Sequence, residues 1–135
     1  MKGEPVMDFM EATRIDVASL KWEPFVSVPK DRVLAGQPET STLLLVEAED
    51  KQMGLWKVTP GAFATDHSGY IEYIQILDGA GRLVSETGTV TELRAGVNVV
   101  MPVGWRGRWE IDVPLTKVFT IVQGGSNDFT IHLKE

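Results

Sequence analysis

The stretch GYIEYIQILDGAGRLVSETGTVTELRAGVNVVMPVGWRGRW, residues 69–109, decides the fold class of this chain. In it, short apolar runs of β-favouring residues alternate with glycine-bearing links. Glycine reaches positive φ without a Cβ clash, which is what short hairpin links require. The pattern predicts strands at 71–77, 82–85, 90–93 and 97–101, spaced about 8–12 residues apart as in a sandwich or barrel.

More strands are predicted on both sides of this stretch. Residues 40–48 form a continuous apolar run, which is typical of a strand covered on both faces. Residues 53–59 alternate, with Trp56 and Val58 on one face. The remaining strands are predicted at 111–113, 115–122 and 129–133. Helical periodicity of useful length is absent, so the sequence predicts a single all-β domain.

The N-terminal part, residues 1–31, is predicted to be an arm outside the domain formed by residues 32–135. Prolines interrupt any regular element there. Trp22 and Phe25 favour docking of the arm, either onto its own domain or onto a partner subunit, because aromatic side chains gain from leaving water. The alternative is a partly ordered tail, since chain ends fray unless they are tied down.

Composition and charge exclude several classes of function. The net charge of −6 and the absence of a basic stripe argue against nucleic acid as a partner. The chain has no cysteine, which excludes disulfides, thiolate nucleophiles and thiolate metal sites. Neither a signal peptide nor a run of about 20 apolar residues is present, so we expect a cytoplasmic protein without a membrane contact.

Glu72 is the most informative titratable residue. It opens an otherwise apolar strand and shares a face with Ile74 and Ile76. A carboxylate on an interior face must be paired, metal-bound or protonated. His67 precedes it by five positions and is the natural candidate to act with it, whereas His132 is expected at the surface.

Common catalytic motifs are missing. The sequence has no Gly-x-Ser-x-Gly elbow, no P-loop and no dinucleotide fingerprint. Paired carboxylates of the glycosidase kind stay open, but no specific pair is indicated.

Two spaced motifs resemble those of the cupins. Glu72, six residues and Gly79 are similar to the end of the first cupin motif, and Gly96, five residues, Pro102, one residue and Gly104 to the start of the second. The wider pattern is Gly54-Leu55-Trp56, Thr59-Pro60-Gly61, Glu72, Gly79, Gly96, Pro102-Val103-Gly104, Gly107, Trp109-Glu110 and Lys117-Val118.

Over residues 32–122 this pattern resembles small single-domain, RmlC-like cupins of the ureidoglycine aminohydrolase and ethanolamine-utilisation type. The resemblance implies a double-stranded β-helix, that is, a jelly-roll barrel. It also implies pairing as a homodimer and a small-molecule site in the barrel mouth.

Of the four positions that hold the metal in such cupins, only two carry a metal-ligating residue in this sequence. The resemblance places the three histidine positions at Thr65, His67 and Gly107, and the glutamate position at Glu72. One imidazole and one carboxylate would hold a divalent metal weakly. We therefore expect no tight native metal and no other cofactor. In a metal-dependent enzyme, Asp66, Tyr70 or Lys117 would have to supply a further metal ligand, bridging through water.

Aromatic and basic residues supply the candidate ligand-binding groups. Trp56, Phe63, Trp105 and Trp109 either line an aromatic pocket around His67 and Glu72 or simply pack the core. In the pocket interpretation Gly107 leaves space for the ligand. The remaining candidates are Lys117, which could pair with Glu72 or Glu110, and the Arg106 and Arg108 pair, which is either an anion site or solvated.

We expect a cupin that binds a small polar metabolite, with His67 and Glu72 as the catalytic candidates if the protein is an enzyme. Three alternatives stay open. The first is a metal-dependent cupin enzyme of the aminohydrolase, isomerase or dioxygenase type. The second is a metal-free acid–base enzyme using His67 and Glu72. The third is a structural dimer whose barrel is a closed core.

Overall fold

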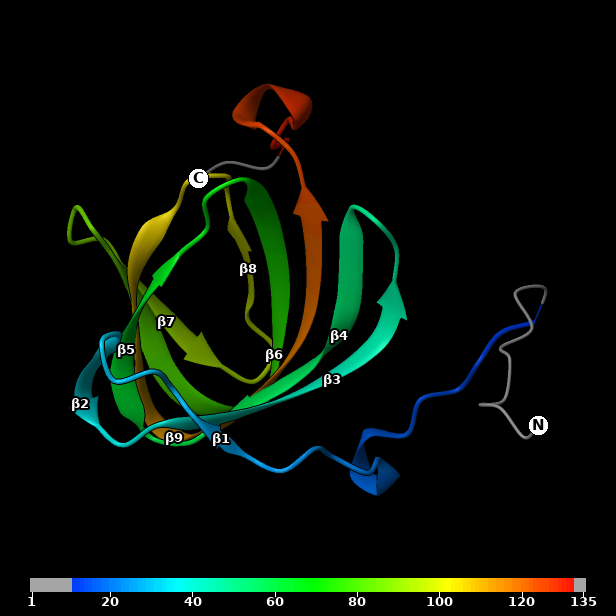
Figure 1. Ribbon diagram of the computed structural model, residues 1–135, viewed down its shortest axis with the longest axis horizontal. Coiled ribbons are helices and arrows are strands. Elements are labelled where there is room, and N and C mark those ends of the chain that lie inside the picture. Colours follow the sequence, from blue (N-terminus) through cyan, green and yellow to red (C-terminus); the bar gives the residue numbers. More distant parts are fainter. Residues whose placement is uncertain (1–10, 133–135) are drawn as a thin grey trace.

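The computed structural model describes residues 11–132 as one curled antiparallel sheet with a short 3₁₀ turn near each end (Figure 1). The first turn is η1 (Val17–Ser19) and the second is η2 (Ser126–Asp128). The strands are β1 (Val26–Ser27), β2 (Val33–Gly36), β3 (Glu39–Glu47), β4 (Lys51–Val58), β5 (Gly61–Asp66), β6 (Tyr70–Ser85), β7 (Val90–Arg94), β8 (Asn98–Met101) and β9 (Arg106–Gln123).

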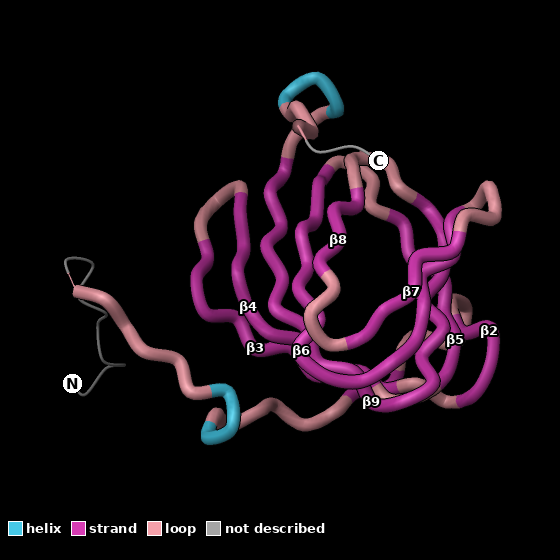
Figure 2. The backbone as a smooth tube through the Cα atoms, turned by 180° about the vertical axis from the view of Figure 1, so that it is seen from behind, coloured by secondary structure: helices cyan, strands magenta, loops and turns pink. Residues whose placement is uncertain are grey.

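Strand β9 is the centre of the sheet. It pairs with β4 along its second half, with β5 along its first half, and with β6 along nearly its whole length. One path through the sheet runs β1-β3-β4-β9-β5-β2, while β7 and β8 pair with β6. Because β6 and β9 bend together, the sheet wraps around an interior, as the ribbon and the backbone tube show (Figures 1 and 2). The predicted all-β jelly-roll barrel is confirmed.

The predicted break between residues 77 and 82 is wrong. Asp78–Gly81 does not reverse the chain, and β6 continues through it with register shifts against β9. Gly79 has φ +97°, and a Cβ there would collide with Pro114 O and Leu115 Cα on β9. The glycines therefore allow a bulged bend between two tightly packed strands. The predicted strands at 111–113 and 115–122 likewise belong to one strand, which passes through Pro114.

Two further expectations fail at the sheet edges. The run at 40–48 is not covered on both faces, since Leu44 and Val46 are 44% and 47% exposed. The predicted strand at 129–133 is absent from residues 129–132, where the chain is irregular after η2. Residue 133 lies outside the described part.

The barrel interior is filled by one face of each strand. On β6 the alternation puts Glu72, Ile74 and Ile76 on the inner face, as predicted, and all three are buried. On the neighbouring strand, β9 contributes Trp109 and Phe119 to the same core. The rest of the buried cluster is Val28, Val58, Phe63, Leu83, Leu93, Met101, Ile111 and Leu115.

The described part of the predicted arm joins the barrel through its second half, where β1 pairs with β3 and Val28 belongs to the buried core. Before that point, Val17, Ala18 and Leu20 border a pocket together with barrel residues. Trp22 lies over the Lys57 ammonium at 4.3 Å, and the Ser41 hydroxyl donates to the Glu23 carbonyl at 2.6 Å. Further toward the N-terminus, the chain leaves the barrel (Figures 1 and 2). Residues 1–10 of the predicted arm lie outside the described part. Between residues 11 and 132 no helix is long and apolar enough to cross a membrane.

The close approach at Gly79 gives a stability prediction. Gly79→Ala should lower the free energy of unfolding by about 3 kcal/mol or more, because it adds a backbone collision to an unfavourable φ. Gly88→Ala is the matched control. Gly88 has a similar φ of +94°, but no atom lies within 4 Å of the place that a Cβ would take, so only the conformational cost of about 1–2 kcal/mol remains. Urea denaturation of both variants checks this, and equal losses would contradict it.

Candidate functional site

A cavity of about 270 Å³ lies inside the barrel between the inner faces of β4, β5, β6 and β9. Four of its lining residues carry charge or can titrate near neutral pH, namely Arg32, His67, Glu72 and Lys117. Aromatic rings form much of the remaining wall, and they come from Trp56, Phe63, Tyr70, Trp109 and Phe119. Mixed walls of this kind, with a few convergent polar groups, are typical of small-molecule sites.

A buried ion pair lies at the centre of this wall. Lys117 Nζ donates to Glu72 Oε2 at 2.7 Å, and the two side chains are each only 6% exposed. Glu72 is on β6 and Lys117 is on β9, and inward alternation aims both at the interior. Of the two partners predicted for Lys117, the structure selects Glu72.

Three aromatic rings surround the Lys117 ammonium. The nitrogen lies 4.3 Å from the Trp56 ring centre, 4.6 Å from that of Trp109 and 5.8 Å from that of Phe119. Ring faces attract a cation and partly replace lost hydration. Burial nevertheless lowers the pKa of Lys117, although the neighbouring Glu72 carboxylate opposes this effect.

His67 is held beside this pair by its backbone. Its N–H donates to the Trp105 carbonyl and its carbonyl accepts from the Gly104 N–H, each at 2.9 Å. Its ring stacks on Tyr70 with centroids 4.8 Å apart, and the Trp105 indole lies edge-on at 5.6 Å. These contacts fix the ring of His67 at the cavity wall.

The electrostatics of His67 favour a neutral ring. Nε2 lies 3.7 Å from Glu72 Oε1, and Nδ1 is buried without a hydrogen-bond partner. Burial lowers the pKa of His67, and this effect exceeds the opposing influence of Glu72. Burial likewise raises the pKa of the Tyr70 hydroxyl. The cavity therefore presents an uncharged imidazole and phenol beside a charged carboxylate.

Most of the residues predicted to bind ligand come together. Trp56, Phe63, Trp109 and Lys117 line the cavity with His67 and Glu72. Trp105 is not part of this lining and packs behind His67. The expectation that Gly107 leaves space for a ligand is wrong, because a Cβ on Gly107 would meet the Trp105 ring and the Val84 carbonyl.

The four positions at which the resemblance implies metal ligands are neighbours in the fold. Thr65 and Gly107 pair across β5 and β9, and His67 faces Glu72. Only one imidazole and one carboxylate are present, and Lys117 occupies an oxygen of that carboxylate. Between residues 11 and 132, no group of three or more His, Cys, Asp or Glu side chains is placed to hold a metal. This donor set does not fit a tightly held divalent ion.

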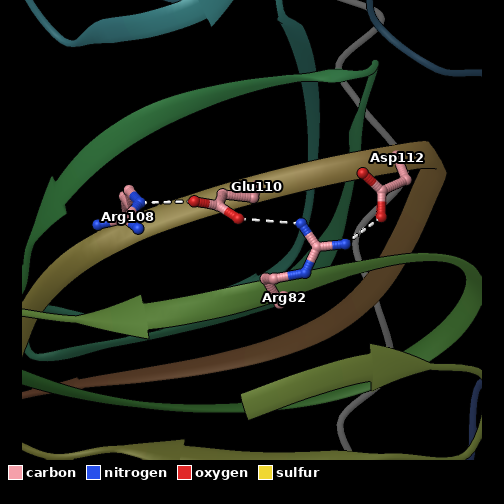
Figure 3. Close-up of polar contacts among 4 residues, drawn as sticks. All are labelled: Arg82, Arg108, Glu110 and Asp112. Carbon is pink, nitrogen blue, oxygen red and sulfur yellow. Dashed lines mark hydrogen bonds and ion pairs between the residues drawn. The ribbon is translucent and has the colours of Figure 1, made fainter. Parts of the chain in front are cut away.

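The other candidates lie outside the barrel. Arg108 pairs with Glu110, and Glu110 also accepts from Arg82, which reaches Asp112 (Figure 3). Arg106 lies 3.5 Å from Asp66, at the border of an outer groove of about 430 Å³. This groove is larger than the inner cavity, but its charged side chains are exposed, and Arg106 pairs there with Asp66 and Glu86. His132 is exposed, as predicted.

Sequence reasoning missed three polar groups of the cavity, Arg32, Thr42 and Gln52. Thr42 pairs with Trp56 across β3 and β4, so it shares the inward face of Trp56. Arg32 precedes β2 and donates from Nε to the Ala64 carbonyl at 2.9 Å. No local pattern marks these residues, because cross-strand register alone brings them to the site.

Solved structures of cupins share this fold at low identity. The EutQ protein of Clostridium difficile superposes with a TM-score of 0.65 at 16% identity, covering 86% of this chain and 90% of that chain. A putative ethanolamine utilization protein Q from Salmonella typhimurium LT2 gives 0.66 at 17% identity, with coverages of 89% and 93%. A predicted oxalate decarboxylase from Thermotoga maritima gives 0.60 at 20% identity, with coverages of 82% and 99%. None of the curated proteins matches this sequence.

The family model described as the EutQ-like cupin domain matches residues 45–119, from the end of β3 to the second half of β9. This span contains Trp56, Phe63, His67, Glu72, Trp109 and Lys117. The resemblance that the glycine and proline spacing indicates is therefore confirmed. With more than half of its residues matched, the chain belongs to the EutQ-like cupin domain family.

Proposed function

We propose that the barrel cavity binds a small polar metabolite, with Lys117, Glu72 and His67 as its polar contacts. The volume of about 270 Å³ is slightly below the range of roughly 300–1,000 Å³ typical of sites for drug-sized ligands. The cavity thus suits a molecule of few heavy atoms. Trp56, Phe63 and Trp109 would contact its apolar part.

The observation that carries this proposal is the arrangement of the buried polar groups. The Glu72–Lys117 pair and the imidazole of His67 converge on this cavity, while aromatic rings form the rest of its wall. A few convergent polar groups in a mostly apolar wall are what a small polar ligand requires.

In this proposal Lys117 supplies the positive charge that balances Glu72. A metal-dependent cupin places a divalent ion beside its glutamate, whereas here an ammonium lies 2.7 Å from the carboxylate. A second cation at the same oxygen would be repelled. We therefore expect no tightly bound metal, and the metal-dependent enzyme is the second candidate.

We also propose that two copies pair through the outer face of the barrel. Met53, Tyr73 and Val100 belong to one cross-strand row on β4, β6 and β8, joined through Thr120 of β9. Each of the three is more than 40% exposed. An exposed apolar row on a sheet is typical of an interface between proteins.

The ligand proposal predicts a thermal shift. A ligand at about 100 times its Kd stabilises the fold by about 2.7 kcal/mol, which raises Tm by several degrees. We expect this from at least one class among small carboxylic acids, amides and sugars. Lys117→Met/Glu72→Gln should abolish the shift. This double variant avoids the cost of about 3–5 kcal/mol for a buried charge left alone.

Lys57→Met is the matched control for that experiment. Lys57 also lies 4.3 Å from a tryptophan ring, but that ring is Trp22 outside the cavity. This variant should keep the shift. No shift with any compound would contradict the proposal. Stoichiometric zinc, manganese, iron or nickel in protein purified without chelator would instead support the metal-dependent enzyme.

The neutral state of His67 predicts a pH dependence of stability. Because burial lowers its pKa below 6.5, the unfolded chain binds a proton more readily than the folded one. The free energy of unfolding should therefore fall as pH drops below about 6.5, by at most about 1.4 kcal/mol per pH unit. The loss ends below the pKa of the folded state.

Variants of the two histidines separate this contribution from others. His67→Gln should reduce the decline between pH 7 and pH 5, while His132→Gln, at an exposed position, should not. Urea midpoints measured across that range provide the test. The same decline in both variants would show that His67 is not the cause.

The pairing proposal predicts the mass of a dimer in light scattering after size exclusion. Tyr73→Glu/Val100→Glu should give a monomer, because it would bury two charges in the interface. Val90→Glu is the control, since Val90 is 52% exposed on β7, away from the row. A monomeric wild type would contradict this proposal.

A further inference from the structure

Among the lysines between residues 11 and 132, Lys117 differs from the others in its surroundings. Its ammonium is almost completely buried and borders a cavity, and its close polar partner is the carboxylate of Glu72 at 2.7 Å. Lys51, by comparison, is 46% exposed and pairs with exposed Asp50. A lysine in an apolar pocket becomes a nucleophile more easily, because water no longer stabilises its charged form.

Resting on the proposed function, we propose that the cavity takes a small aldehyde or ketone and that Lys117 forms an imine with its carbonyl carbon. The geometry supplies the three requirements of this step, namely a recessed amine, a carboxylate within one hydrogen bond, and space for a few heavy atoms.

The step balances with the groups on the cavity wall. Glu72 accepts a proton from the Lys117 ammonium, and the free amine forms a C–N bond to the carbonyl carbon. The C=O electron pair moves to oxygen, which takes the proton lost by the attacking nitrogen to give a carbinolamine. Glu72 then returns its proton to this hydroxyl group, which leaves as water while the C=N bond forms. The sum is protonated amine plus carbonyl giving protonated imine plus water.

The aromatic wall stabilises both the reactant and the product of this reaction. The rings of Trp56 and Trp109 lie 4.3 Å and 4.6 Å from Nζ and shield it from water. A protonated imine keeps a positive charge near that position, so the rings and Glu72 stabilise the product as they stabilise the ammonium. The neutral carbonyl compound enters without bringing a charge into the interior.

Reductive trapping tests the proposal on the full-length protein. Propionaldehyde and sodium cyanoborohydride are added near neutral pH, and propyl groups are located by peptide mass spectrometry. Lys117 should be labelled about tenfold faster than Lys51 or Lys57, because it forms the reducible imine more readily. Lys117→Arg keeps a positive charge and should lose this fast labelling.

Glu72→Gln gives a readout that a purely structural Lys117 would not produce. The Glu72 carboxylate raises the pKa of Lys117, so its removal should move the pH midpoint of labelling to lower pH. The other charged or titratable groups facing the cavity are His67, Tyr70 and Arg32, and all three are retained. An unmoved midpoint would overturn the role given to Glu72.

The outcomes separate this inference from the proposed function. Labelling of Lys117 no faster than that of Lys51 and Lys57 would overturn imine formation, even if a non-carbonyl compound still raises Tm. If no compound raises Tm and Lys117 is not labelled preferentially, both proposals fail. Fast labelling confined to Lys117 supports both.

Discussion

The continuous pairing of β6 with β9 is the constraint on which the rest of the structure depends. These two strands stay hydrogen-bonded from Tyr70 opposite Gln123 to Ser85 opposite Gly107, and every other strand attaches to one of them directly or through one or two neighbouring strands. The pair can curve because Asp78–Gly81 absorbs the register shifts. Without that bend, the inward faces of the two strands could not close around a common interior.

The chemistry of the interior follows from this pairing. Glu72 and Lys117 are 45 residues apart in sequence, yet inward alternation on the two strands brings their charged ends to 2.7 Å. The barrel thus buries a carboxylate together with its own counter-ion. His67 is added from the link between β5 and β6, where backbone hydrogen bonds to Trp105 and Gly104 fix it. Charge balance is reached with protein groups alone.

The sequence was sufficient to predict the fold class and to name many of the residues that line the candidate cavity. The spacing of glycine and proline indicated a cupin barrel. Glu72 and Ile74 are two positions apart on one strand and so share a face, which indicated a buried carboxylate. The ends of the strands were harder to predict, because the same glycine-rich link forms a hairpin turn or a bulge depending on what packs against it. Only the structure shows Leu115 of β9 at Gly79.

The remaining features of the cavity depend on the register between strands that are distant in the sequence. This register makes Glu72 the partner of Lys117 and brings Arg32, Thr42 and Gln52 to the cavity. The displacement of Trp105 behind His67 depends on the Pro102–Trp105 turn, whose shape local sequence does not determine.

The aromatic surroundings of Lys117 have an optical consequence. Of the four tryptophans in the chain, Trp56 and Trp109 are in contact with this ammonium, while Trp22 lies on the outside of the barrel. A cation close to an indole changes its emission, and so does an added molecule in the same space. Intrinsic fluorescence can therefore follow events in the interior in real time, without a dye and in the unmodified protein.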